Sequence, residues 1–255
     1  MFELKNVVVN REGRDILSID NLYIDSNEFT VILGHNGSGK STLAQVLAGQ
    51  LKPDSGQVKF SAQMMTELST RLLAQKIAFL PQRLPEVAGL TVEELVRLGR
   101  FAWRGTFGRY NQQDSDIITT AMQQTNTAHF CKHTADSLSG GERQRAWIAM
   151  LLAQQSQVLI LDEPTSALDV SHQYDLLSLL KSLNKETKQG VIVILHDINL
   201  ALRFATQVVA LEQGKVSFTG DHSVLLDSQN LSDLYGTEIT LIDHPSRDEK
   251  VAVVC

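Results

Sequence analysis

The amino-acid sequence predicts an α/β fold with a mostly parallel sheet. Segments that are almost continuously apolar recur along the 255 residues, at positions 29–33, 77–80, 158–161, 191–195 and 208–211. Helix-like stretches separate them, and apolar strands that alternate with helices are typical of a parallel sheet covered on both faces. A glycine-rich loop between the strand at 29–33 and a helix at 42–48 is the second indication of this class.

The remaining elements follow from local signals. Further strands are expected at residues 7–9, 22–24 and 57–60, and the tail predicts a hairpin around 212–215, a helix near 231–235 and strands at 239–242 and 251–254. From residue 83 to about 135 the pattern is mostly helical, because Thr91 and Glu94 form a capping box before a helix to Arg97, and residues 114–124 predict another. No linker interrupts the chain, so we expect one domain over residues 1–255 with a helical insertion at about 83–155.

The glycine-rich loop is the first candidate site. It reads Gly34, His35, Asn36, Gly37, Ser38, Gly39, Lys40, Ser41 and Thr42. Glycines allow backbone N–H groups to approach a ligand closely, and the following helix start favours anions, so a polyphosphate is expected here. In similar P-loop proteins the residues matching Lys40 and Ser41 bind the outer phosphates and magnesium, and Thr42 would contact the inner phosphates. The alternative is a glycine-rich turn with one exposed lysine.

Composition limits the classes of protein and partner. A hydrophobic content of 43% and a charged content of 20% allow a sizeable core, and a net charge of −6 argues against a nucleic-acid coat. Cys131 and Cys255 are too far apart to indicate a disulfide framework or a zinc site, which fits a reducing cytoplasm. Neither a leader nor an apolar run of about 18 residues is present, so we expect any membrane span to come from a partner.

Two carboxylates follow a predicted buried strand. Asp162 and Glu163 come directly after residues 158–161, and ligands of α/β proteins bind at the carboxyl ends of such strands. One carboxylate can hold magnesium and the other can orient and deprotonate a water molecule, as phosphoryl transfer requires. Taken alone, a strand-end Asp-Glu pair is also common as a helix cap.

A serine and two glycines open a second helix with an anion-binding start. Ser139, Gly140, Gly141 and Glu142 precede an amphipathic stretch at residues 147–152. An ordinary N-cap would look the same. The position about twenty residues before Asp162 favours the functional interpretation.

These motifs together resemble the ATP-binding-cassette (ABC) ATPases. The likeness covers most of the chain and comprises the P-loop at 34–42, the Q-loop Gln82, the signature at 138–144, the Walker B residue Asp162, the base Glu163, the D-loop residue Asp169 and the switch histidine His196. It implies a P-loop NTPase core with a mostly parallel sheet, an N-terminal antiparallel β portion and an inserted α-helical subdomain. Without the other motifs, His196 would be interpreted as a structural histidine at a strand end.

The resemblance also implies a mechanism. ATP and Mg²⁺ are the expected ligands, with the metal held by Ser41, Gln82 and Asp162 and with Glu163, His196 and Gln82 in the catalytic group. Two copies would form a head-to-tail homodimer in which Ser139, Gly140, Gly141 and Glu142 cap the phosphate bound by the partner's P-loop, and Asp169 would touch the opposite site. The family often stacks adenine on an aromatic residue where this chain has Arg11, whose guanidinium either stacks on the base or is a solvated charge.

Finer resemblance is to the ATPase subunits that import ferric siderophores, haem and cobalamin, closest to the ferric hydroxamate type. It is carried by residues 80–85, 98–105, 136–172, 234–236 and 244–245, with Ala102 where proline is frequent. The implied partners are a transmembrane permease and, indirectly, a periplasmic or surface substrate-binding protein, with no nucleic acid. The implied location is the cytoplasmic face of the inner membrane. Alternatives are a haem or cobalamin importer, a soluble ABC ATPase acting on ribosomes or DNA, and a non-catalytic regulator that only binds ATP.

Residues 97–110 mix basic and aromatic side chains. They are Arg97, Arg100, Arg104 and Arg109 with Phe101, Trp103, Phe107 and Tyr110. Such composition is enriched at protein contacts, and the same residues could equally pack beneath the helical insertion. The family resemblance favours a surface beside the permease.

Overall fold

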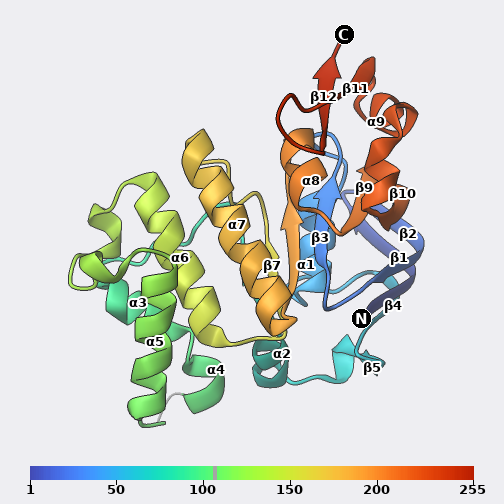
Figure 1. Cartoon of the computed structure of the whole chain (residues 1–255). Coiled ribbons are helices and arrows are strands. Elements are labelled where there is room, and N and C mark those ends of the chain that lie inside the picture. The colour runs from blue at the N-terminus through green and yellow to red at the C-terminus, as the bar shows by residue number, and fades with distance from the viewer. Residues whose placement is uncertain (106–107) are drawn as a thin grey trace. The chain divides into compact units, whose positions relative to one another are not determined.

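The computed structural model describes residues 1–105 and 108–255. Contacts divide the chain into two compact units, residues 1–67 with 190–255 and residues 68–189. Figure 1 colours the chain from blue at the N-terminus to red at the C-terminus, so the first unit combines the blue elements with the orange and red ones.

The first unit is centred on three parallel strands. These are β3 (Phe29–Leu33), β8 (Gly190–Ile194) and β9 (Gln207–Glu212), with β3 in the middle and β10 (Lys215–Asp221) pairing antiparallel to β9. Every residue of β3 and β8 is buried, which requires apolar side chains on both faces. The one polar residue of β3, Thr30, is satisfied because its hydroxyl donates to Gln207 Oε1 at 3.0 Å.

A four-stranded antiparallel sheet also belongs to this unit. Its strand order is β2-β1-β4-β5, with bounds β1 (Phe2–Arg11), β2 (Arg14–Ile24), β4 (Ser55–Phe60) and β5 (Gln63–Met64). Along β1 the side chains of Phe2, Leu4, Val7 and Val9 are buried, and the polar residues between them face away from the core. Phe2 packs against Phe60 of β4 in a tilted arrangement, with ring centroids 4.7 Å apart.

Helices and a terminal hairpin make up the rest of the first unit. They are α1 (Lys40–Leu47), α8 (Ile198–Phe204), α9 (Ser228–Tyr235), the 3₁₀ helices η1 (Met65–Glu67) and η4 (His222–Leu226), and the antiparallel pair β11 (Ile239–Asp243) and β12 (Lys250–Val254). In Figure 1 the red α9, β11 and β12 form one group, and α8 contacts β12.

The second unit contains two parallel strands, β6 (Ile77–Leu80) and β7 (Val158–Leu161). Its helices are α2 (Thr70–Lys76), α3 (Val92–Leu98), α4 (Phe101–Arg104), α5 (Gln112–Gln124), α6 (Gly140–Gln154) and α7 (Val170–Thr187), with 3₁₀ turns η2 (Ala128–Phe130) and η3 (Ala135–Ser137). Helices α3, α5 and α6 pack against one another in the green part of Figure 1. In the described part of the chain, no helix has the length and apolar character needed to cross a membrane.

The α/β class with parallel strands, an antiparallel portion and a helical stretch is confirmed. The strands at 29–33, 77–80 and 158–161 have the predicted bounds, and Thr91 and Glu94 form the predicted capping box. Helix α5 begins two residues before the predicted start, because Asn111 is its N-cap and Asp114 completes a capping box with it. Helices α2, α4, α7 and α8 were not predicted individually.

Candidate active site

The phosphate loop joins β3 to α1 through left-handed backbone. Gly34 has φ 142° and Gly39 has φ 97°. A side chain at Gly34 would collide with the carbonyl oxygen of Leu211, and one at Gly39 would lie 2.9 Å from the carbonyl of Ile16. Both positions therefore require glycine, as expected for a loop whose backbone must approach a ligand.

Lys40 is buried at the start of α1 and reaches back across the loop. Its Nζ donates to the carbonyl oxygens of Gly34 and His35, both at 2.8 Å, and its exposed fraction is 5%. The first turn of α1 contains no acidic residue, so the partial positive charge of the helix start is not neutralised there. Ser41 and Thr42 follow on the same turn and are half-buried, while His35, Asn36 and Gly37 are exposed. A bound polyphosphate would therefore meet a concentrated positive potential.

His196 follows the strand next to the phosphate loop. Ile32 and Ile194 are register partners in the parallel pair of β3 and β8, so Gly34 and His196 each lie two residues beyond that pair. The pairing continues past the strand, because Leu195 N–H donates to Ile32 O at 3.3 Å. His196 is exposed at this edge. The structure therefore brings the switch histidine and the loop to the same end of the parallel strands.

In the second unit, Gln82 and Glu163 likewise follow the ends of two paired parallel strands. Leu80 and Leu161 are register partners in β6 and β7, and each side chain comes two residues after its strand. Gln82 Nε2 donates to Glu163 Oε2 at 2.6 Å. The predicted Q-loop glutamine and the predicted base are thus in direct contact.

Asp162 and Glu163 are held by backbone bonds at the end of β7. Asp162 is 3% exposed, and its N–H donates to Leu80 O at 2.9 Å. Glu163 adopts a left-handed conformation with φ 50°, and its carbonyl accepts from both the N–H and the hydroxyl of Ser166. Such a conformation is uncommon for residues other than glycine, and backbone strain of this kind is enriched at active sites.

Ser139 is the N-cap of α6 and forms a capping box with Glu142. Its hydroxyl donates to Glu142 Oε2 at 2.7 Å, and Glu142 N–H returns a bond to the hydroxyl at 3.4 Å. The bond from the Ser139 side chain lowers the pKa of Glu142, and the Ser139 backbone N–H adds to this effect. Ser139 and Gly140 are exposed, and Gly141 and Glu142 are half-buried. The helix start is therefore accessible to a ligand from outside this unit.

Asp169 is the N-cap of α7. Its Oδ1 accepts from the N–H of His172 at 2.9 Å, which lowers the pKa of the Asp169 carboxyl, and it lies 2.7 Å from His172 Nδ1. The residue is exposed. It can therefore serve as a helix cap and still present its second oxygen outwards.

Comparison with known proteins identifies the family. A family model described as ABC transporter matches residues 17–166, more than half of the chain. The chain belongs to the ABC transporter family. The predicted class, an ABC-type ATPase of a transporter, is thereby confirmed.

Curated relatives of this ABC protein are similar over most of their length. The ferric enterobactin transport ATP-binding protein FepC of Escherichia coli (strain K12) is 39% identical over 222 residues, 87% of this chain and 82% of FepC. The iron(3+)-hydroxamate import ATP-binding protein FhuC of Bacillus subtilis (strain 168) is 36% identical over 233 residues, 91% and 87% of the two chains. The hemin import ATP-binding protein HmuV of Pseudomonas fluorescens is 36% identical over 258 residues, 99% of each.

Solved ABC structures share the fold. An inward-facing transporter assigned to the metal-chelate type has a TM-score of 0.85 at 26% identity, covering 100% of this chain and 97% of that one. The dimeric bacterial cassette MJ0796 has a TM-score of 0.79 at 32% identity, covering 87% and 99%. That cassette is also a dimer in a post-hydrolysis state bound to ADP and Pi.

The donor chemistry of this ABC protein suits magnesium. Ser41, Gln82 and Asp162 offer a hydroxyl, a carboxamide and a carboxylate, all of them oxygen donors. Mg²⁺ prefers oxygen ligands, and it commonly uses only one or two carboxylates together with water and substrate phosphates. Each of these donor groups is therefore of a kind that suits the predicted metal.

Arg11 lies at the end of β1, where the β1–β2 hairpin turns. It is exposed, and Glu12 and Gly13 form the turn with positive φ angles. Arg11 pairs across the hairpin with Arg14. The stacking of Arg11 on adenine stays a prediction.

Residues 97–110 of the ABC protein combine a buried ion cluster with an exposed aromatic rim. Asp114, which has no exposed side-chain surface, accepts from Arg100 Nε at 3.0 Å and from Arg104 Nε at 2.7 Å. Arg100 Nη1 also donates to the carbonyl of Ala153 at 2.8 Å. Two of the eight residues of the predicted contact surface, Arg100 and Arg104, are therefore engaged in internal structure. Phe107, which belongs to the same prediction, lies outside the described residues.

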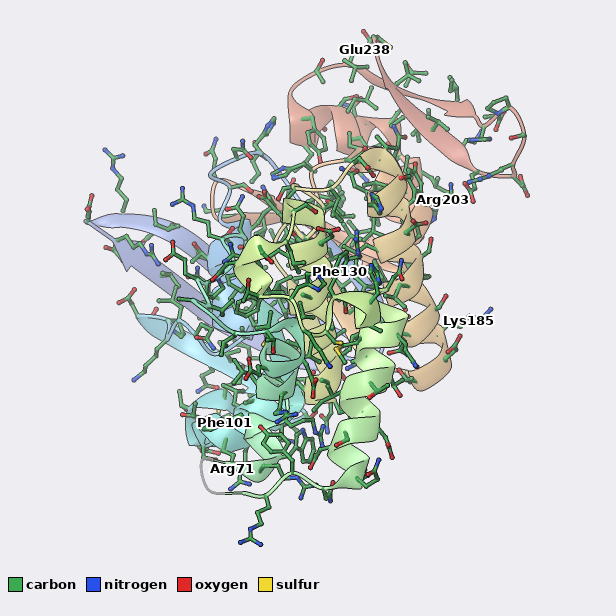
Figure 2. The ribbon with its side chains drawn as sticks, turned by 90° about the vertical axis from the view of Figure 1, so that its left-hand side faces the viewer. Arg71, Phe101, Phe130, Lys185, Arg203 and Glu238 are labelled. Atoms are coloured by element: carbon green, nitrogen blue, oxygen red, sulfur yellow. The ribbon has the colours of Figure 1, made fainter. Side chains whose placement is uncertain are left out.

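The other aromatic side chains of this segment face outwards. Phe101 is 53% exposed, and Trp103 and Tyr110 are also exposed. Arg71 of α2 fixes the backbone beneath them, because its Nε donates to Ala102 O at 2.9 Å and its Nη2 to Trp103 O at 2.8 Å. Figure 2 shows Arg71 and Phe101 close together at this end of the unit. The backbone around Phe101 and Trp103 is thus anchored to α2, while both side chains remain exposed.

The sequence analysis did not identify the contacts of two residues, Asp114 and Tyr235. Asp114 was predicted only as the start of a helix, although the spacing from Asn111 could have suggested a capping box. Tyr235 of α9 packs against His35 of the phosphate loop, with ring centroids 5.5 Å apart. No local pattern links two residues 200 positions apart, so only the tertiary structure shows that contact.

Proposed function

We propose that this chain is the ATP-hydrolysing subunit that energises import of a ferric siderophore, of the hydroxamate type, through a separate transmembrane permease. The observation that carries the proposal is its similarity to FepC and FhuC over more than four-fifths of each protein. The phosphate loop around Lys40 and the contact of Gln82 with Glu163 supply the chemistry that such a subunit needs.

Each group has a defined part in hydrolysis. Lys40 and the N–H groups of residues 34–42 bind the outer phosphates, and Ser41, Gln82 and Asp162 hold Mg²⁺. Bound magnesium neutralises phosphate charge and so stabilises the transition state. Glu163 accepts a proton from the attacking water, which Gln82 helps to orient, and His196 donates a hydrogen bond to the γ-phosphate.

The working unit is a homodimer. The capping box at the exposed start of α6 would present Ser139, Gly140, Gly141 and Glu142 to the nucleotide bound by the partner, and Asp169 would contact the opposite site. The dimeric MJ0796 cassette supports this arrangement. ATP binding closes the dimer and hydrolysis opens it again.

The permease is the partner at the membrane. We propose that residues 1–255 form one nucleotide-binding domain, that the helical subdomain at about 83–155 carries the permease-facing rim of Phe101 and Trp103, and that the subunit is peripheral on the cytoplasmic face of the inner membrane. A periplasmic or surface binding protein delivers the cargo. No nucleic acid takes part, and a soluble role on ribosomes or DNA predicts no co-purification with a polytopic membrane protein.

Uptake by a deletion strain tests the cargo. We expect loss of this subunit to abolish uptake of labelled ferric hydroxamates while haem and cobalamin uptake stay normal, and the restored gene should rescue it. The similarity to HmuV favours haem as the second candidate. Loss of haem uptake with normal ferric hydroxamate uptake would replace the siderophore with haem and leave the ATPase assignment intact.

Lys40→Ala tests the phosphate loop. The lysine contributes charge-assisted bonds to phosphate, each of which contributes about 1.5–3 kcal/mol, so the loss of two such bonds corresponds to about a 10² to 10⁴-fold loss of ATP affinity. Titration calorimetry with ATP and Mg²⁺ measures it. Lys52→Ala is the matched control, because Lys52 is exposed just beyond α1. Equal affinity in the two variants would place the phosphates elsewhere.

A further inference from the structure

The C-terminal segment contacts the phosphate loop through one aromatic pair. Tyr235, the last residue of α9, meets the imidazole of His35 edge-on, with ring centroids 5.5 Å apart and an interplanar angle of 65°. His35 is the second residue of the loop, and its carbonyl accepts from Lys40 Nζ at 2.8 Å. The contact therefore connects α9 to the lysine that we assign to the phosphates.

The hydroxyl of Tyr235 is an unusual feature of this contact. Its oxygen is buried, and nothing in the described part of the chain forms a hydrogen bond with it. Burial, with a smaller effect from the charge of Asp197, raises the pKa of Tyr235 to about 12, so the phenol keeps its proton and remains a donor. A buried donor without a partner costs stability, and such groups in native proteins require an explanation.

Asp197 is the acceptor with the right chemistry. It follows His196 and caps α8 through Oδ1, which accepts from the N–H groups of Asn199 and Leu200 at 2.7 and 3.2 Å. A carboxylate has a second oxygen with free lone pairs, which can accept another bond. His35, which the Tyr235 ring contacts, and Asp197 each lie three residues beyond the register pair of Ile32 and Ile194, so this carboxylate follows the strand next to the loop that Tyr235 packs on.

The C-terminal segment also forms hydrogen bonds with α8. Asn199 exchanges two hydrogen bonds with the backbone of Ala252 in β12, at 3.2 and 2.8 Å. Helix α9 is fixed to β11 because Ser232 Oγ accepts from Ile239 N–H at 2.9 Å. Residues 228–255 thus contact both the phosphate loop, through Tyr235, and the helix that follows His196, through Ala252.

We propose that Tyr235 is a positioning residue of the nucleotide site, whose hydroxyl bonds the Asp197 carboxylate when the phosphate loop holds a nucleotide. Phosphate competes for the Lys40 ammonium and so releases the His35 carbonyl, which lets the loop and the ring packed on it shift together. The bond then joins the phosphate loop to the start of α8, beside His196. The proposal rests on the proposed function, because it requires ATP binding.

Tyr235→Phe separates the hydroxyl from the ring. We expect thermal unfolding of the nucleotide-free variant at the same or a higher temperature, because the unpartnered donor is gone, and an affinity for a non-hydrolysable ATP analogue with Mg²⁺ that is about tenfold weaker, since bonds to charged groups are the stronger ones. If Tyr235 had only a structural role, the substitution would not weaken binding of the analogue while the unfolding temperature stayed the same or rose. Tyr23→Phe is the control, as Tyr23 is exposed on β2 of the same unit.

A double-mutant cycle with Asp197→Asn identifies the partner. Asparagine keeps a side-chain oxygen to cap α8, so the helix start survives. If Tyr235 and Asp197 act through one bond, the double variant binds the analogue as the weaker single variant does. Additive losses would remove Asp197 from the proposal.

The measurements distinguish failure of the role proposed for Tyr235 from failure of the proposed function. Normal binding by the Tyr235→Phe variant, or a lower unfolding temperature without nucleotide, overturns the role of Tyr235 alone. Failure of the unsubstituted chain to bind the analogue overturns the proposed function and this inference together. Tyr235→Ala, which removes the ring from His35, should weaken binding further than Tyr235→Phe, and the phenylalanine variant decides the matter if the alanine variant does not fold.

Discussion

Glu163→Gln should reduce ATP turnover by about 10² to 10⁴-fold, the range that a positioned general base contributes, while ATP still binds. The amide has almost the shape of the carboxylate but cannot take a proton from water. Gln82 Nε2 can still donate to the side-chain oxygen at position 163, as it does to Glu163 Oε2 in the native chain. The lost function is therefore proton acceptance and not the position of Gln82.

The same variant should accumulate as an ATP-bound dimer, because hydrolysis is the step that opens it. Phosphate release measures turnover, and size-exclusion chromatography with ATP and Mg²⁺ measures assembly. Glu86→Gln is the matched control, since Glu86 is exposed on the segment that follows Gln82. Turnover by the Glu163→Gln variant at the rate of this control would remove Glu163 from the role of base.

The parallel strands and the residues at their ends were predictable from the sequence. Segment 158–161 is wholly apolar and segment 29–33 is apolar except for Thr30, and both become buried strands with those bounds. Parallel strands place their carboxyl ends at one edge, so Gly34 with His196, and Gln82 with Glu163, follow from strand order and register alone. The capping box of Thr91 was predictable too, because it depends only on residues that are close together in the sequence.

The partners of the charged groups were not predictable in the same way. Arg100 and Arg104 were interpreted as members of a contact surface, because composition alone cannot distinguish an exposed arginine from one that meets a buried carboxylate. Their partner Asp114 lies 14 residues after Arg100 and 10 after Arg104, on another helix. The ring contact of Tyr235 with His35 depends on packing of distant segments, and residue type carries no signal for it.

The burial of Asp114 gives the largest expected effect on stability. Asp114→Asn should lower the free energy of unfolding by about 3–5 kcal/mol, the usual cost of removing one partner from a buried ion pair. Arg100, which is 5% exposed, would be left with an uncompensated charge beside the backbone of Ala153. Chemical denaturation measures the loss. Asp116→Asn, an exposed position two residues further along α5, should change stability by less than about 0.5 kcal/mol.

Acid should remove the difference in the free energy of unfolding between the native chain and the Asp114→Asn variant. Burial opposes ionisation of Asp114, but the N–H of Asn111 and the two guanidinium groups outweigh it and hold the pKa of this carboxyl below its ordinary value of 3.8. A lowered pKa stabilises the fold fully above the pKa of the unfolded chain, and this contribution is lost as pH falls through the folded value. The gap in unfolding free energy should therefore be constant above about pH 5 and narrow below about pH 4. A gap that stayed unchanged down to pH 3 would show that the charge of Asp114 is not what stabilises α4 and α5.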